Sequence, residues 1–299
     1  MRIKHYIWPI LLALGCRQNT DIVLPKEAPI LVVNSVLSSD SFITVRLSYT
    51  QGITENVPVV FESGAMVTIY DQDTQLIENL ANAGNGWYKG AIKALPSKKY
   101  LAKIAINSSV YWAFDSVPTQ PDINITDTSR IFFQGKPGFF SIEAALSDKQ
   151  ISTNYYGMKM RYFYEYYTLD ANGQPDDTID KNEWIDIETV DPILTESDFS
   201  KFSKKHLLWS DKYFNNTTAI LRVGSSVIIR NNRQKPHYLV VYTEHYTAGS
   251  FQYYTTLNEH IFYQNDPFSQ PTIVNGNIPN AFGSFVGRSV KVDTIHFQQ

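Results

Sequence analysis

Apolar and polar positions alternate along residues 30–120 in short segments separated by turn residues. Residues 30–37 form a continuous, largely apolar run, and residues 42–49 alternate with a period of two, which is typical of a half-buried strand. Similar segments follow one another as far as residues 110–117. About seven short strands with this spacing predict an immunoglobulin-like β-sandwich.

Two prolines, Pro118 and Pro121, interrupt the strand pattern, since neither can donate to a sheet ladder. We therefore place a domain boundary there and expect residues 121–299 to form a second, antiparallel β domain. Strands are predicted over residues 123–147, split by a turn at 135–138.

A long aromatic strand over residues 155–169 is expected to pair with residues 184–190 in a hairpin. Residues 220–223 and 227–230 form another candidate pair. The last strand is predicted over residues 290–297, after a Pro-, Asn- and Gly-rich tail.

One substantial helix is predicted from Ala248 to about Gln264, ended by Asp266 and Pro267. Apolar side chains recur there at helical spacing: Phe251, Tyr254, Leu257, Ile261 and Phe262. The sequence thus predicts a mainly β protein with a single substantial helix.

The first residues have the order of an export signal. Arg2 and Lys4 precede an apolar stretch, and Gly15 precedes Cys16, the chain's only cysteine. This arrangement resembles a bacterial lipobox, which implies a signal peptide over residues 1–15 and lipid attachment at Cys16. Residues 16–29 then form a polar tether to the folded domain. The alternatives are an ordinary cleaved signal and an apolar leader with an incidental buried cysteine.

Composition excludes two classes of protein. With no second cysteine, no intramolecular disulfide can form, so a packed core must stabilise the chain. The net charge of −3 lacks the basic excess that nucleic-acid binding needs. The 19 Tyr and 17 Phe residues suit a strand-rich exported protein.

Candidate chemistry is sparse. Residues 170–177, with Asp180 and Glu183, contain carboxylate and amide oxygens of the kind that bind Ca²⁺. Their spacing differs from that of an EF-hand loop, and the alternative is a solvated hairpin tip. The six histidines include no pair at zinc-helix spacing, and Gly224-Ser225-Ser226 does not fit a nucleophile elbow. We expect neither an enzyme nor a metal or cofactor site.

Aromatic residues supply the candidate interaction surface. A period of two places Tyr162, Tyr164 and Tyr166 on one face of their strand. Phe282 and Phe285 lie in the glycine-rich tail. The alternatives are an ordinary strand face for the tyrosines and a packed closing loop for the phenylalanines.

Several segments in a fixed order resemble the domain-of-unknown-function family 4249. They are residues 31–37 with 45–48, Trp87-Tyr88 before Tyr100, residues 211–215, 266–271 and 277–283, and Phe285. Members are typically envelope lipoproteins of Bacteroidota, often encoded beside a TonB-dependent outer-membrane receptor. The resemblance implies partnership and carries no catalytic residue.

We therefore expect an outer-membrane lipoprotein that acts as a non-catalytic binding or accessory subunit of a TonB-dependent uptake system. Its partners are the membrane, through the lipid anchor, and the receptor; the sequence identifies no small-molecule or glycan ligand. Either side of the outer membrane fits. Two alternatives stay open: a stand-alone surface structural or adhesion module, and a glycan-directed hydrolase.

Overall fold

The computed structural model of the chain describes residues 28–52, 57–133, 136–149, 152–189, 191–195, 202–225, 234–264, 266, 268–270 and 272–297. Within these ranges the protein is mainly β with one substantial helix, as the sequence predicts. Cys16, the leader and most of the tether lie outside the described residues, as do residues 227–230.

Seven strands precede the prolines in the part of the chain that the structure describes: β1 Leu31–Ser38, β2 Phe42–Tyr49, β3 Met66–Asp71, β4 Leu76–Asn82, β5 Trp87–Lys93, β6 Lys99–Ile106 and β7 Ser109–Ser116. The elements that follow are β8 Asp122–Phe133, β9 Lys136–Ser147, β10 Tyr155–Leu169, β11 Pro175–Trp184, α2 Pro192–Thr195, β12 Leu207–Ser210, β13 Thr218–Ser225, β14 Gln234–Tyr246, α3 Ala248–Tyr263 and β15 Phe282–His296.

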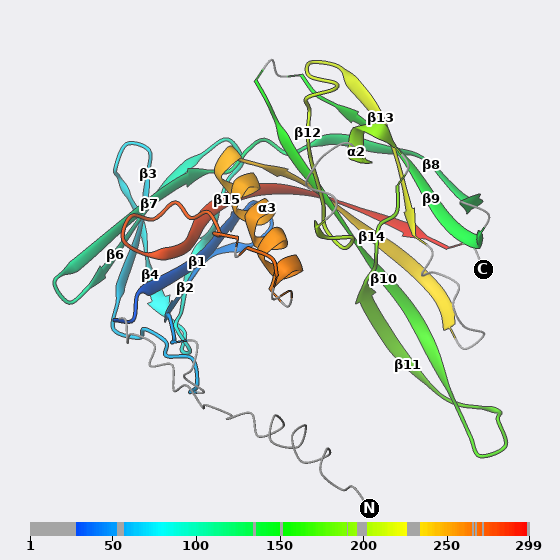
Figure 1. The fold of residues 1–299 in the computed structure, drawn as a ribbon, viewed down its shortest axis with the longest axis horizontal. Helices are drawn as coiled ribbons and strands as arrows, with labels where there is room; N and C mark the ends of the chain where they lie inside the picture. Colours follow the sequence, from blue (N-terminus) through cyan, green and yellow to red (C-terminus); the bar gives the residue numbers. More distant parts are fainter. Residues whose placement is uncertain are drawn as a thin grey trace, which may run out of the picture.

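One long sheet crosses both halves of the chain. Among the described residues its strand order is β11-β10-β14-β15-β1-β2-β5-β4-β3-β6-β7, and β12 also pairs with β10. The C-terminal strand β15 runs parallel to β1 and antiparallel to β14, so it joins the first strand of the chain to the second half (Figure 1). Strands β13, β9 and β8 form a separate sheet.

Two apolar cores flank this shared strand. The inward residues of β1 to β7 form the first, and Phe285 of β15 completes it. The second packs β10, β12 and β14 against β9 and β13, and Ile295 of β15 lies against it. β15 is 15 residues long, so Phe285 near its start and Ile295 near its end supply apolar contacts to different cores.

The immunoglobulin-like arrangement predicted for residues 30–120 is not confirmed. Strand β4 pairs with both β3 and β5, so the ladder continues from one group of strands to the other. The predicted boundary at Pro118–Pro121 stays a prediction.

The hairpin partner of β10 was predicted wrongly. β11 covers Pro175–Trp184 rather than residues 184–190. The reason is the turn: Asp170 Oδ1 accepts hydrogen bonds from the backbone N–H groups of Asn172 and Gln174 at 2.9 and 2.8 Å, so the chain reverses before Pro175. Every residue of β11 is exposed, which explains why its sequence shows no apolar alternation.

β15 begins at Phe282, eight residues before the predicted start of the last strand. Gly283 has a φ of +85°, and a Cβ there would collide with the carbonyl oxygen of Val33 on β1. A Cβ on Gly287 would likewise collide with the carbonyl oxygen of Ser116 on β7. The glycines therefore permit close strand contacts rather than marking a loop.

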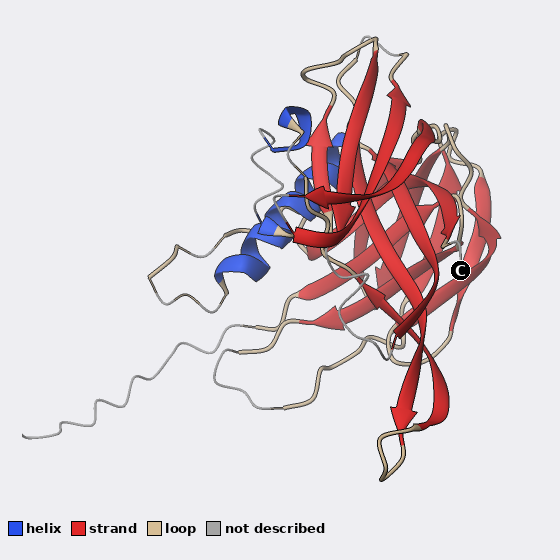
Figure 2. Ribbon diagram, turned by 90° about the vertical axis from the view of Figure 1, so that its right-hand side faces the viewer, coloured by secondary structure: helices blue, strands red, loops and turns tan. Residues whose placement is uncertain are grey.

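The helix prediction is confirmed in position. The side chain of Thr247 caps α3 by accepting the N–H of Ser250 at 3.1 Å. Figure 2 shows α3 lying on one side of the strands. Phe251 is buried, whereas Ile261 and Phe262 are exposed, so only the first half of the predicted apolar face is covered.

We predict that Phe285→Ala lowers the free energy of unfolding by about 3 to 5 kcal/mol, because it removes a fully buried ring from the first core. Urea unfolding of the purified protein measures the change. Phe282→Ala on the same strand is the matched control, since its side chain is 53% exposed and a loss below about 1 kcal/mol is expected. Equal losses would contradict the placement of Phe285.

Candidate functional site

The outer faces of β3, β6 and β7 form one apolar surface. Strand register aligns Met66 with Ala105 and Val110, and it aligns Tyr70 with Leu101 and Phe114. Trp112 lies between these two rows, opposite Lys103. We call the following side chains the outer-face patch: Met66, Tyr70, Leu101, Val110, Trp112 and Phe114.

The patch is open to solvent although its opposite face is core. Met66 is 56%, Trp112 44% and Phe114 74% exposed. On the same strands the alternate residues Ile104 and Ala113 are buried. Large apolar side chains gathered on one exposed face are typical of a protein-binding surface.

The edge of β7 borders this patch. β7 is the last strand of the long sheet, and no described strand pairs with its outer edge (Figure 1). Its C-terminal end is held by Asn277, which donates to Phe114 O at 3.2 Å, and by the N–H of Gly287, which donates to Asp115 Oδ2 at 2.8 Å. The rest of the edge offers backbone groups to a partner strand.

A hollow of about 450 Å³ lies beside the patch. Phe114 and Tyr100 line one part of it, and the β3–β4 turn at residues 71–74 lines another. An aromatic row beside a hollow provides the aromatic anchors and the recess on which protein complexes depend.

A second cluster lies beneath α3 and is charged rather than apolar. It centres on Glu244 of β14, whose side chain is 3% exposed. Its neighbours come from five places in the chain: Lys159 on β10, His206 before β12, Tyr246 on β14, Tyr254 on α3 and Arg288 on β15. Gly157 of β10 faces Glu244, and a Cβ there would come within 2.7 Å of the Tyr246 ring.

Both carboxylate oxygens of Glu244 are engaged. Oε1 accepts from Lys159 Nζ at 3.2 Å and from Arg288 Nη1. Oε2 accepts from the hydroxyl of Tyr246 and lies 3.2 Å from His206 Nε2. Lys159 also places its ammonium group 5.6 Å from the ring centre of Tyr254.

The protonation states follow from burial and charge. Burial alone would raise the pKa of Glu244, but the hydrogen bond from His206 and the charges of Arg288 and Lys159 outweigh it and hold that pKa well below its usual range. Burial lowers the pKa of His206, so at neutral pH its contact with Glu244 is a neutral hydrogen bond. Burial raises the pKa of Tyr254 to about 12.

The Glu244 cluster suits a structural role. A carboxylate offers about four acceptor positions, and Glu244 already meets four polar groups. No free lone pair is left for a substrate proton. The cluster instead ties α3 to β10, β14 and β15.

The five predicted surface aromatics are not brought together. Tyr162 is fully buried in the second core, where its ring stacks on Tyr164 with centroids 4.8 Å apart, and Phe285 is fully buried in the first core. These two residues belong to no surface, because each points from its strand toward a core. Tyr164 and Tyr166 are partly exposed, and Phe282 is 53% exposed.

The outer-face patch was missed by sequence reasoning, although a signal existed. Val110, Trp112 and Phe114 alternate along one strand. Tyr111 and Ala113 between them are also apolar, so periodicity alone does not tell which face meets solvent.

We predict that Glu244→Gln lowers the free energy of unfolding by about 2 to 3 kcal/mol, because it leaves two cations without their counter-charge. The loss falls short of that for a fully buried pair, since the Lys159 and Arg288 side chains are 21% and 23% exposed and reach water. Denaturant unfolding at pH 7 measures it. Glu259→Gln on α3, outside the cluster, should change stability by less than about 0.5 kcal/mol.

The same cluster predicts a pH dependence. In the folded protein the pKa of Glu244 lies below its ordinary value of 4.5. The ionised carboxylate therefore stabilises the fold fully above about pH 4.5, and this stabilisation is lost as the pH falls from there toward the folded-state pKa. The stability gap between the wild type and Glu244→Gln should therefore shrink from about pH 5 to about pH 3. A gap that is constant over this interval would contradict the assigned ionisation.

Comparison with known proteins gives a family rather than an activity. No curated protein matches the chain. A bovine butyrophilin crystal structure aligns with 73% of this chain and 92% of its own at 8% identity, but the TM-score of 0.19 supports no argument. Among the described residues, no helix is long and apolar enough to cross a membrane.

The family model described as a domain of unknown function (DUF4249) matches residues 18–294, which confirms the resemblance, and the chain belongs to this family.

Proposed function

We propose that the protein is an outer-membrane lipoprotein, anchored through Cys16, that serves as a non-catalytic binding or accessory subunit of a TonB-dependent uptake system. The outer-face patch carries this proposal. It offers exposed aromatic and aliphatic side chains beside an open strand edge, as expected of a surface for a protein partner.

The tether between Cys16 and the folded part is long enough for the patch to reach a partner in the same membrane. Residues 16–29, if fully extended, span at most about 46 to 50 Å, because an extended residue advances at most about 3.3–3.6 Å. The folded part thus stays within reach of the membrane surface and of a receptor embedded in it. Confinement to one membrane raises the effective concentration of the two partners.

Burying the side chains of the patch would contribute enough free energy to help stabilise a complex. Burying one large apolar side chain contributes about 1.5 to 3 kcal/mol. Trp112 and Phe114 are the largest exposed members, so we expect them to dominate the interface. As part of the proposal, residues 30–120 act as an immunoglobulin-like scaffold; seven strands around one core support this.

The test is a mild-detergent pull-down of the tagged full-length protein from its native outer membrane, followed by mass spectrometry. We expect one TonB-dependent receptor to be recovered in stoichiometric amount. Cys16→Ser should weaken recovery because it removes the anchor. The double variant Trp112→Asp, Phe114→Asp should abolish it, because it places charges in the patch.

Ile273→Asp is the matched control, since Ile273 is 82% exposed and lies outside the patch. Its recovery of the receptor should equal that of the wild type. Failure to recover any stoichiometric partner would refute the accessory role and favour a stand-alone surface module. Loss of cell adhesion on deletion would then identify that alternative, and sugar turnover abolished by a carboxylate substitution would identify a hydrolase.

A further inference from the structure

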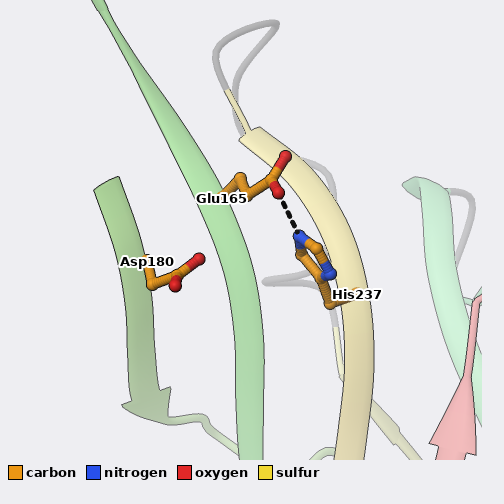
Figure 3. Close-up of side chains that lie close together, drawn as sticks. All are labelled: Glu165, Asp180 and His237. Carbon is orange, nitrogen blue, oxygen red and sulfur yellow. Dashed lines mark ion pairs between the residues drawn. The ribbon is translucent and has the colours of Figure 1, made fainter. Parts of the chain in front are cut away.

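Three side chains with metal-ligating atoms lie together on neighbouring strands, away from the outer-face patch. They are Glu165 of β10, Asp180 of β11 and His237 of β14 (Figure 3). Strand register sets Glu165 directly opposite Asp180. One potential ligand atom from each residue lies within 4.8 Å of the other two.

A bulge in β14 provides the histidine. The pairing of β10 with β14 passes from Phe163 opposite Tyr238 to Tyr164 opposite Pro236, so His237 is the extra residue. Bulges of this kind re-aim a side chain. The His237 ring turns toward Glu165, as Figure 3 shows.

The imidazole nitrogen that faces the carboxylates is available. His237 Nε2 lies 3.1 Å from Glu165 Oε1, but this contact does not have hydrogen-bond geometry. Nε2 is buried and has no hydrogen-bond partner among the described residues. A buried imidazole nitrogen that makes an ion-pair contact but no hydrogen bond, next to two carboxylates, is suited to coordinate a cation.

We propose that Glu165, Asp180 and His237 bind a divalent transition-metal ion of the zinc class. One imidazole nitrogen and two carboxylate oxygens form a ligand set that Zn²⁺ accepts, whereas Ca²⁺ and Mg²⁺ prefer oxygen alone. Three protein ligands leave at least one coordination position open for water or for a ligand from outside the chain.

The three ligand atoms need to move only slightly closer together to coordinate a zinc ion. Zinc–ligand distances of about 2.0–2.2 Å place the atoms of a tetrahedral site about 3.4 Å apart. Because the ligand atoms already lie within 4.8 Å of one another, no separation has to shorten by more than about 1.4 Å. Asp180 is exposed, so rotation of its side chain can supply this movement.

One cation competes for the site. Lys235 Nζ lies 3.9 Å from Glu165 Oε2, and the two side chains are 42% and 25% exposed. Ion pairs this long and this exposed contribute little to stability. A bound metal ion can displace the ammonium group at small cost.

This site could not be predicted from the sequence because its ligands are distant along the chain. Glu165 and Asp180 meet only through the β10–β11 register, and His237 joins them through the bulge. No metal-binding motif spaces residues in this way.

The experiment is calorimetric titration of ZnCl₂ into metal-stripped full-length protein in detergent, purified with a tag that contains no histidine. We expect one Zn²⁺ per chain. His237→Ala, Glu165→Gln and Asp180→Asn should each weaken binding at least about tenfold. Matched controls are His260→Ala on α3 and Asp176→Asn on β11, which should bind as the wild type does.

Co²⁺ provides a second readout, because its visible absorption reports the coordination geometry. Addition of Co²⁺ should produce a tetrahedral-type spectrum that is absent from His237→Ala. Circular dichroism checks that each variant folds, and the two carboxylate variants test the site if the histidine variant does not. Absence of Zn²⁺ binding, binding by the three ligand variants as tight as that of the wild type, or binding of Ca²⁺ in preference to Zn²⁺ would overturn the proposal.

Discussion

The pairing of β15 with both β1 and β14 is the constraint on which the rest of the structure depends. A strand from the C-terminal end is inserted beside the first strand, and close approach is possible because Gly283 carries no Cβ toward Val33. Asn277 reinforces the junction by donating to the carbonyl oxygens of Phe114 and Phe285. This pairing joins residues that are far apart in sequence, and closing the intervening chain costs entropy. The apolar burial in the two cores that β15 connects must offset that cost.

The Glu244 cluster forms at this junction for the same reason. Arg288 reaches Glu244 only because β15 lies beside β14, and Lys159 arrives from the opposite neighbour, β10. Because the buried carboxylate is the shared partner of Lys159 and Arg288, removing it leaves two cations without their counter-charge. Strands β3, β6 and β7, which carry the outer-face patch, lie at one end of the sheet, and the β10–β11 ribbon lies at the other, as Figure 1 shows.

Local pattern predicted much of this fold. The alternating residues of β2 and β6, and the helical spacing of apolar residues in α3, were sufficient to predict these elements. The sequence failed where the signal was not local. β11 is polar throughout, and the first residues of β15 have the composition of a loop. Strand register determines which face of β7 meets solvent, and it determines which residues lie near Glu165. No single segment of the sequence encodes that register.

Site-specific photo-crosslinking in the living cell tests most directly that the outer-face patch binds a membrane partner. A photoreactive residue at Phe114 replaces the most exposed aromatic side chain of the outer-face patch, and one at Ile273 serves as control. We expect position 114 to yield one dominant adduct with an outer-membrane receptor and position 273 to yield none. Absence of an adduct at position 114, or the same adducts at both positions, would contradict this expectation.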